Sequence, residues 1–403
     1  DRPVRGPEGS EPFGTFVARM RAAAGMTEGA AIGRPAFGGD RHGLSVSPEP
    51  PQPDEAPRWR VPTLYQEGNE TNSDRVFRFS QRADPEHRPV APVVSRGIAY
   101  LNSGLTLRAV DISSGHTLWQ RGTRQRLAEW RDNRVAVHTA AIAGDIVYAA
   151  LASRSDAPDM DREFYGRTIV YRLPHRTLGA YDARTGDVLW SHADEALGAH
   201  PDAAEIARES VASPPLIVGD DVLVATWVFD SAFDVRVVCF DRRTGATRWR
   251  RSVAQGQQEL NLFGRPVKEL ATTPLAELDG RVYLATGLGV AASVRLSDGA
   301  IEWIAAYPQT PIPPSNYWYQ TVERPLTWWP STTAATRLGV VMAPTESPFL
   351  VAFHPADGRM LWSVAHTRGP FDFDHFVGVA GGRVIVLGDR AAAFDLESGA
   401  LAW

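Results

Sequence analysis

The residues best suited to metal chemistry are Asp372-Phe-Asp374-His375. Carboxylate oxygens are ligands that hard cations such as Ca²⁺ prefer, and strand alternation would put Asp372 and Asp374 on one face. Acidic pairs at the start of a strand are more often solvated than metal-bound. We therefore predict no metal site and keep Asp372 and Asp374 as weak candidates only.

Other catalytic patterns are missing from the sequence. There is no Gly-x-x-x-x-Gly-Lys phosphate loop and no Cys-x-x-Cys-His haem motif. Cys239 is the single cysteine, so it forms no disulfide within the chain, and its apolar strand predicts a buried structural thiol. Asn102, His138 and Arg324 have no spacing that forms a triad. We predict no catalytic residue.

Aromatic side chains gather in one proline-rich segment, residues 305–330. Stiff proline segments that hold clustered aromatics could stack on a sugar or on a partner peptide. The alternative is a loop whose aromatics pack on one another. The candidate partner-binding residues are Tyr317, Trp318, Tyr319, Trp328 and Trp329.

The elements that must position these residues come from a repeat. The stretch Ala180-Tyr-Asp-Ala-Arg-Thr-Gly186-Asp-Val-Leu-Trp190 has five further copies, and in all six a Gly stands four residues before a Trp. A fixed internal spacing of this kind is the signature of a repeat architecture. The six tryptophans are Trp119, Trp190, Trp249, Trp303, Trp362 and Trp403.

Each copy predicts the same local structure. An apolar strand ends at a residue, usually Asp, that bonds its own backbone and starts a turn. Gly then takes a positive φ, and a second strand leads to the Trp. Upstream lies another strand pair, for example Pro214–Val224. Four short antiparallel strands per unit predict an all-β β-propeller, in which the Trp suits a contact between blades.

This pattern resembles the quinoprotein-like (PQQ-like) propeller family, whose tryptophan-docking signature is Ala-x-Asp-x-x-x-Gly-x-x-x-Trp. The resemblance covers roughly residues 35–403 and departs from the signature at Leu296 and His354, where Asp is expected. It implies four-stranded antiparallel blades. Six repeat units are present, whereas relatives usually have seven or eight blades, and we expect further blades in a longer natural chain, or residues 58–66 as a closing strand.

The resemblance implies three possible functions. We rank first a non-catalytic, extracytoplasmic or periplasmic scaffold whose rim loops, above all 305–330 and 153–166, bind a protein or a glycan. The second is a dehydrogenase that uses PQQ with calcium and often has adjacent cysteines, which this chain lacks. The third is a carbohydrate-binding propeller. No cofactor is therefore expected unless the second reading holds.

Residues 1–34 form a separate predicted segment. Phe13, Phe16, Val17 and Met20 make one apolar helical face, which packs on the propeller or belongs to an upstream helical region. A Pro- and Gly-rich linker follows, and Trp59 resembles a docking Trp without a partner. Later, Asp202-Ala-Ala-Glu205 is a capping box that predicts a short helix.

Charge and hydropathy exclude some classes of partner. The net charge of −5 and the pI near 6.1 give no reason to expect nucleic acid. No apolar stretch is long enough for a membrane helix. The chain begins at Asp1 with neither Met nor a signal peptide, so we expect a processed protein or a fragment.

Overall fold

The structure is a computed structural model of the chain. It describes residues 91–122, 139–152, 175–193, 203–230, 232–257, 270–311, 332–366, 372–388 and 390–403, together with Trp59 and short strands at 3–6, 9–12, 33–34, 162–164 and 167–169.

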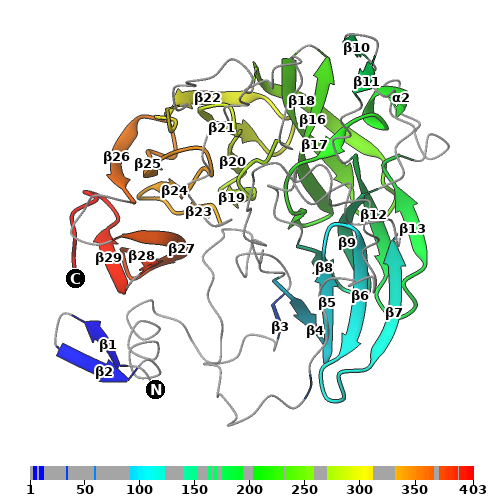
Figure 1. The fold of residues 1–403 in the computed structure, drawn as a ribbon, viewed down its shortest axis with the longest axis horizontal. Coiled ribbons are helices and arrows are strands. Elements are labelled where there is room, and N and C mark those ends of the chain that lie inside the picture. Colours follow the sequence, from blue (N-terminus) through cyan, green and yellow to red (C-terminus); the bar gives the residue numbers. More distant parts are fainter. Residues whose placement is uncertain are drawn as a thin grey trace.

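Six antiparallel sheets follow one another in chain order round a common centre (Figure 1). We call them blades 1 to 6. Blade 1 has β3 (Gly33–Arg34), β4 (Val93–Ser95), β5 (Ile98–Asn102), β6 (Thr106–Asp111) and β7 (Thr117–Gly122). Blade 2 has β8 (Ala141–Ala143), β9 (Ile146–Ala152), β12 (Arg176–Asp182) and β13 (Val188–Ser191). Blade 3 has β14 (Ser210–Val211), β15 (Leu216–Val218), β16 (Asp221–Asp230), β17 (Ala232–Asp241) and β18 (Thr247–Gly256).

The second half of the ring repeats the plan. Blade 4 has β19 (Ala276–Leu278), β20 (Arg281–Ala285), β21 (Val290–Arg295) and β22 (Ile301–Ala306). Blade 5 has β23 (Ala334–Ala335), β24 (Val340–Met342), β25 (Phe349–Phe353) and β26 (Met360–Ala365). Blade 6 has β27 (Phe373–Ala380), β28 (Arg383–Gly388) and β29 (Ala391–Asp395), extended by a bridge from Phe394 to Leu401. The predicted all-β propeller with six units is confirmed.

The core lies between the blades. In a blade that lies between two others, the second strand is buried on both faces because a neighbouring sheet covers each side. The run Val147–Ala152 of β9 in blade 2 is an example. Five apolar clusters fill the five spaces between successive blades, and each cluster contains one repeat tryptophan. In order from blade 1 these are Trp119, Trp190, Trp249, Trp303 and Trp362.

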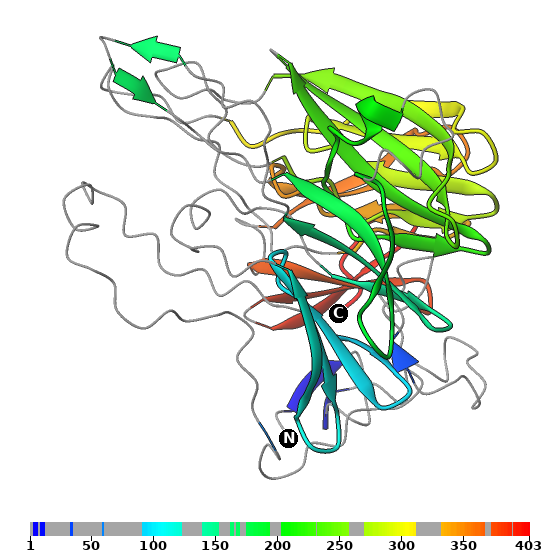
Figure 2. The same ribbon diagram turned by 90° about the vertical axis from the view of Figure 1, so that its right-hand side faces the viewer.

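Smaller elements lie outside the blades. The capping box is followed by the short helix α2 (Ala203–Ile206), as predicted. β10 (Arg162–Phe164) and β11 (Arg167–Ile169) form a hairpin that stands off the ring in Figure 2, at the upper left. β1 (Pro3–Gly6) pairs with β2 (Gly9–Pro12). In the part of the chain that the structure covers, no helix is long and apolar enough to cross a membrane.

The N-terminal segment is described only in part. The helix expected over Phe13–Met20 lies outside the described residues. β3 lies just before residue 35, where the sequence places the start of the propeller, and it pairs with Val94 and Ser95 of β4. Residues 33–34 therefore extend blade 1 by one short strand.

A buried polar cluster joins the α2 segment to blade 3. The side chain of Glu209 is 0% exposed. Its Oε1 is 2.7 Å from Arg236 Nη1, and its Oε2 accepts a 2.5 Å hydrogen bond from Thr226 Oγ1. Arg250 Nε lies 3.4 Å from the same Oε1. A buried carboxylate is tolerated when it is paired in this way, and removal of one partner is costly.

His192 ties the same segment to blade 2. Its Nδ1 accepts the N–H of Leu178 at 2.7 Å, and its Nε2 lies 3.1 Å from the carbonyl oxygen of Glu209. Since Nδ1 is an acceptor, Nε2 carries the proton and donates. Burial lowers the pKa of His192 from 6.5 to about 4. The folded protein therefore keeps this ring neutral.

We expect this histidine to make stability depend on pH. Its contribution is complete above pH 6.5, where the ring is neutral in both states. It falls as the pH drops from 6.5 toward 4, because the unfolded chain takes up a proton that the folded chain excludes. The loss is on the order of 1–3 kcal/mol. Urea denaturation between pH 7.5 and 4.5 measures it.

The matched variant is His192→Asn, whose amide oxygen can still accept the Leu178 N–H. Its stability should fall less with acid than that of the wild type. His116→Asn, at an exposed turn position, should keep the wild-type curve. Parallel curves for wild type and His192→Asn would show that His192 is not the source.

Candidate functional site

Each repeat tryptophan that faces a following blade makes the same contact. Its indole N–H donates to the carbonyl of the residue three positions before the turn glycine of the next blade. We call this the Trp–turn contact. The bonds are Trp59 to Ile112 (2.6 Å), Trp119 to Ala183 (2.9 Å), Trp190 to Arg242 (3.1 Å), Trp249 to Leu296 (2.8 Å), Trp303 to Pro355 (2.9 Å) and Trp362 to Leu396 (2.8 Å).

The glycine of the turn is required for two reasons, as Gly245 shows. Its φ is +75°, a left-handed conformation that favours glycine, which confirms the predicted turn. The Trp190 ring also lies flat against it, and a Cβ at Gly245 would come within 2.7 Å of Trp190 Cδ2. Any side chain here would push the ring out of its place.

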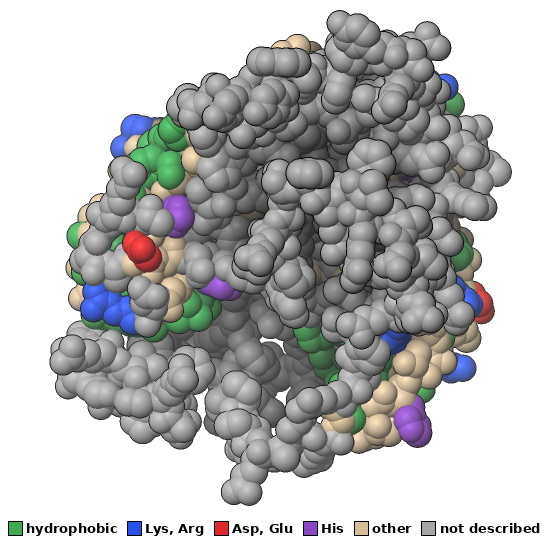
Figure 3. All heavy atoms as spheres, in the orientation of Figure 1, with side chains coloured by type: hydrophobic (Ala, Val, Ile, Leu, Met, Phe, Trp, Pro, Cys, Tyr) green, Lys and Arg blue, Asp and Glu red, His purple; other side chains and the backbone are tan. Residues whose placement is uncertain are grey.

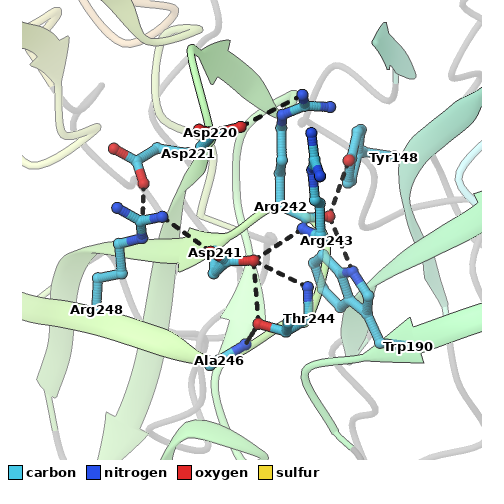
Figure 4. A network of polar contacts seen from close by, with 10 residues as sticks. All are labelled: Tyr148, Trp190, Asp220, Asp221, Asp241, Arg242, Arg243, Thr244, Ala246 and Arg248. Carbon is cyan, nitrogen blue, oxygen red and sulfur yellow. Dashed lines mark hydrogen bonds and ion pairs between the residues drawn. The ribbon is translucent and has the colours of Figure 1, made fainter. Parts of the chain in front are cut away.

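A tyrosine donates to the same carbonyl in three of these contacts. Tyr148 Oη donates to Arg242 O at 2.8 Å, beside the bond from Trp190 (Figure 4). Tyr100 and Tyr283 donate in the same way to Ala183 O and Pro355 O, at 3.2 and 3.3 Å. In each pair the two ring centroids are 6.0 Å apart. A carbonyl has two lone pairs and can accept both bonds.

Sequence reasoning missed these tyrosines, although a signal was present. Each stands three residues after a turn Gly or Asp at the start of the second strand: Gly97-Ile-Ala-Tyr100, Asp145-Ile-Val-Tyr148 and Gly280-Arg-Val-Tyr283. Blade 3 has Leu223 at this place, so only the tryptophan donates there. Glycine and tryptophan carry the repeat pattern, whereas a tyrosine on an apolar strand is typical of any buried core.

An aspartate closes the turn as predicted. Asp241 Oδ1 accepts the N–H groups of Arg243 and Thr244, both at 3.0 Å (Figure 4). Asp111 and Asp182 do the same in blades 1 and 2. The hydroxyl of Ser113, the N–H of Ser114 and its hydroxyl hold the pKa of Asp111 at about 2. These carboxylates are occupied in structural bonds.

In the turns of blades 4 and 5 the aspartate position holds another residue, and in blade 4 that residue differs from the predicted one. We expected Leu296 in the aspartate position of blade 4, but Gly299 N bonds Arg295 O, so Arg295 occupies that position. His354 holds it in blade 5. Both turns are capped differently: Asp298 and Asp357, each just before the glycine, accept the N–H of the residue just after it at 3.0 Å.

Two tryptophans lie at the ends of the series. Trp59 was predicted to lack a partner, and this is wrong, because it contacts the turn of blade 1. The backbone of Trp403 pairs with Ala393 of β29. The docking role of its indole stays a prediction.

The connections between strands are distributed unequally over the two faces of the ring. In each blade, the turn from the innermost strand to the next and the turn from the third strand to the outermost lie on one face and are short, such as 144–145, 219–220 and 279–280. Because the strands are antiparallel, the strand ends at all other connections lie on the opposite face. The longest stretches of sequence between blade strands, 123–140, 153–175, 192–209, 257–275 and 307–333, begin and end at that face. We call it the loop-bearing face.

The predicted rim insertions, residues 153–166, 192–211 and 305–330, fall mostly within the long stretches of sequence that begin and end at the loop-bearing face. The aromatic candidates themselves, Tyr317, Trp318, Tyr319, Trp328 and Trp329, lie outside the described residues. Whether they bind a partner stays a prediction.

The acidic candidates have a different local structure from the one expected. Asp372 is exposed and precedes β27, and the pairing of β27 with β28 shifts register between Phe373 and His375. Asp374 falls at this bulge, so simple alternation does not apply. Over the described ranges, no group of three or more His, Cys, Asp or Glu residues could hold a metal ion.

The resemblance allows a quinone with calcium, and the described residues contain no group of three or more His, Cys, Asp or Glu for the calcium. Beside the inner strands the polar groups are hydroxyls that hold the scaffold. Ser213 Oγ and Thr273 Oγ1 accept the N–H groups of Ala225 and Ala285, each at 2.9 Å. Thr333 Oγ1 donates to Thr273 Oγ1 at 2.9 Å. No carboxylate set joins them in the described part of the chain.

Cys239 is buried in blade 3, in the apolar cluster that contains Trp249. Burial raises the pKa of its thiol well above the ordinary value. A thiol held in this form is a poor nucleophile and a poor metal ligand. The predicted structural thiol is confirmed.

The sequence matches a model of one protein family. A family model described as outer membrane protein assembly factor BamB matches residues 157–321 and 315–403. No curated protein matches the chain.

Solved structures resemble the fold at low identity. BamB from Moraxella catarrhalis is 14% identical, with a TM-score of 0.42 over 78% of this chain and 72% of that one. A europium-containing methanol dehydrogenase is 11% identical, with a TM-score of 0.50 over 78% and 68%. The quinohemoprotein alcohol dehydrogenase from Comamonas testosteroni is 13% identical, with a TM-score of 0.48 over 97% and 74%. At these identities the likeness concerns the fold alone.

We expect Trp190→Ala to lower the free energy of unfolding by about 3–5 kcal/mol, as for other large-to-small changes in a core. Trp190 is 2% exposed, and its loss leaves a cavity between blades 2 and 3. Leu189→Ala, at the exposed neighbouring position, should change stability by less than about 0.5 kcal/mol. Guanidinium denaturation measures both. An unchanged midpoint for Trp190→Ala would refute the docking role.

Tyr148→Phe should cost less, about 0.5–1.5 kcal/mol, because it removes one hydrogen bond and keeps the ring. The matched control is Tyr181→Phe. Tyr181 is also buried, and among the described residues its hydroxyl has no hydrogen-bond partner. Equal melting temperatures for the two variants would show that the second bond to Arg242 O contributes nothing.

Proposed function

Because the chain belongs to the family described as outer membrane protein assembly factor BamB, we propose that it is a non-catalytic scaffold that binds a protein partner. The observation that carries the proposal is the one-sided distribution of connections. The long stretches between blade strands begin and end at the loop-bearing face, and short turns occupy the other. Binding residues concentrate on loops that a rigid frame positions.

The frame supports this role. Six Trp–turn contacts join successive elements of the chain from Trp59 to blade 6. The Glu209 cluster and His192 hold the α2 segment, which belongs to one long connection, against blades 2 and 3. A loop held at its base loses less conformational entropy when it binds.

The family description also supports a cellular location, because it names an outer membrane protein assembly factor. We place this chain outside the cytoplasm, at a bacterial envelope, with a protein as the partner. A glycan partner for the aromatics at 317–329 is a separate hypothesis that rests on the sequence alone.

Site-specific crosslinking tests which face binds. A photo-crosslinking amino acid is placed at Asp230 or Ala204, both exposed on the loop-bearing face, and at Ser113 or Arg243, both exposed on the hairpin-turn face. Asp230 and Ala204 should give adducts with one and the same envelope protein, and Ser113 and Arg243 should give none. Adducts from the hairpin-turn face alone would reverse the assignment of the binding face.

The competing reading, a quinone-dependent dehydrogenase, has its own test. Purified protein is mixed with PQQ and calcium and followed by calorimetry, absorbance and dye-linked alcohol oxidation. We expect no heat, no spectral change and no turnover. Micromolar or tighter binding with alcohol oxidation would show an enzyme and refute the scaffold proposal.

A further inference from the structure

Among the described residues, the outer strand of each of blades 1 to 5 has one edge without a neighbouring strand. β7, β13, β18, β22 and β26 each end the strand order of their sheet. Such an edge can pair with another chain unless it is short or charged. β13 is short, with four residues, and β18 carries Arg248, Arg250 and Arg251. These two edges are protected.

β22 has neither protection. It is six residues long, and the two large side chains that it exposes are Ile301 (40%) and Ile304 (49%). Its one charged residue, Glu302, pairs with Arg281 and Arg295 of its own sheet. With respect to the described strands, the edge therefore presents unpaired backbone groups beside apolar side chains.

A bulge brings the two isoleucines onto one face. Ile301 lies opposite Val294 and Ile304 lies opposite Ala292, with a register shift between Ser293 and Val294. Val294 and Ala292 belong to the apolar cluster between blades 3 and 4. Ile301 and Ile304 thus continue that core toward the circumference. Described hydrophobic side chains reach the surface at the flank of the ring in Figure 3, at the upper left.

A positive charge lies beside this strip. Arg251, two residues after Trp249, donates from Nε to Gly299 O at 2.9 Å, and its side chain is exposed. Arg121 of blade 1 makes the same bond to Gly186 O at 2.6 Å, and its Nη2 also pairs with Asp187 at 2.9 Å. Ala300 stands where blade 2 has Asp187. Within the described chain, Arg251 has no carboxylate partner.

We propose that the outer edge of β22 takes up an extended strand of a partner protein, with apolar side chains on Ile301 and Ile304 and a carboxylate on Arg251. Main-chain bonds to a free sheet edge give such a complex its affinity, and the side chains give its specificity. The charge pair selects an acidic segment. This surface lies on the circumference, so it is separate from the loop-bearing face.

Defined synthetic peptides test the proposal on the purified chain. The probe is an octapeptide of alternating Val and Thr with one central Asp. One matched peptide has Lys in place of Asp, and a second has N-methylated amides that block strand pairing. The Asp peptide should bind by calorimetry and protect β22 amides from hydrogen exchange. The Lys peptide should bind about tenfold more weakly, and the N-methylated peptide should not bind.

Variants assign the binding to this edge. Arg251→Gln should weaken the Asp peptide about tenfold and remove the preference for Asp over Lys. Ile304→Lys should abolish binding. The control is Val188→Lys, at an exposed apolar position of the short strand β13, which should leave affinity unchanged. Melting temperatures establish that each variant is folded.

Several results would overturn the proposal. The proposal is wrong if the Asp peptide does not bind, or if the N-methylated peptide or the Lys peptide binds with the same affinity as the Asp peptide. It is also wrong if folded Ile304→Lys binds the Asp peptide as tightly as the wild type does. A concentration-dependent dimer of the wild type that Ile304→Lys dissociates would assign the edge to a second copy of this chain instead. None of these outcomes bears on crosslinks from the loop-bearing face.

Discussion

The hydrogen bond from a tryptophan indole to a turn carbonyl of the next blade is the interaction on which the rest of the structure depends. The donor is buried between two sheets, and a buried N–H without an acceptor costs about 1–3 kcal/mol. The turn must therefore stay where the indole needs it. Its glycine must leave room for the ring, its aspartate must close the loop, and the two sheets must meet in one register.

Much of the fold was predictable because the repeat is local and periodic. The spacing of Gly and Trp sufficed for the six units, the hairpins and the positive φ of Gly245, and a capping box sufficed for α2. The failures concern contacts between sheets. The partner of Trp59 lies 53 residues away in sequence. The second donor Tyr148 looks like any core aromatic. The aspartate position of blade 4 is a different case, because the spacing of four residues before Gly299 already points to Arg295 and not to Leu296.

The candidate site was less predictable than the fold. A register shift interrupts β27 at Asp374, so strand alternation does not tell which face this residue takes, and such shifts leave little mark in a single sequence. The one-sided placement of long connections does follow from the order of strands, once each strand is located. What binds there does not follow, since one propeller fold serves both dehydrogenases and assembly factors. The side chains on the loops decide that.

The Trp–turn contact has a direction: each of blades 1 to 5 gives an indole to the blade that follows, and each of blades 2 to 6 receives one from the blade before. Such head-to-tail interfaces generate a ring when their rotation closes and a helix when it does not. The contact itself sets no number of units. Duplication of one unit would copy a donor and an acceptor together and leave every existing interface intact. In evolution, a ring built this way can change its circumference without a new kind of interface.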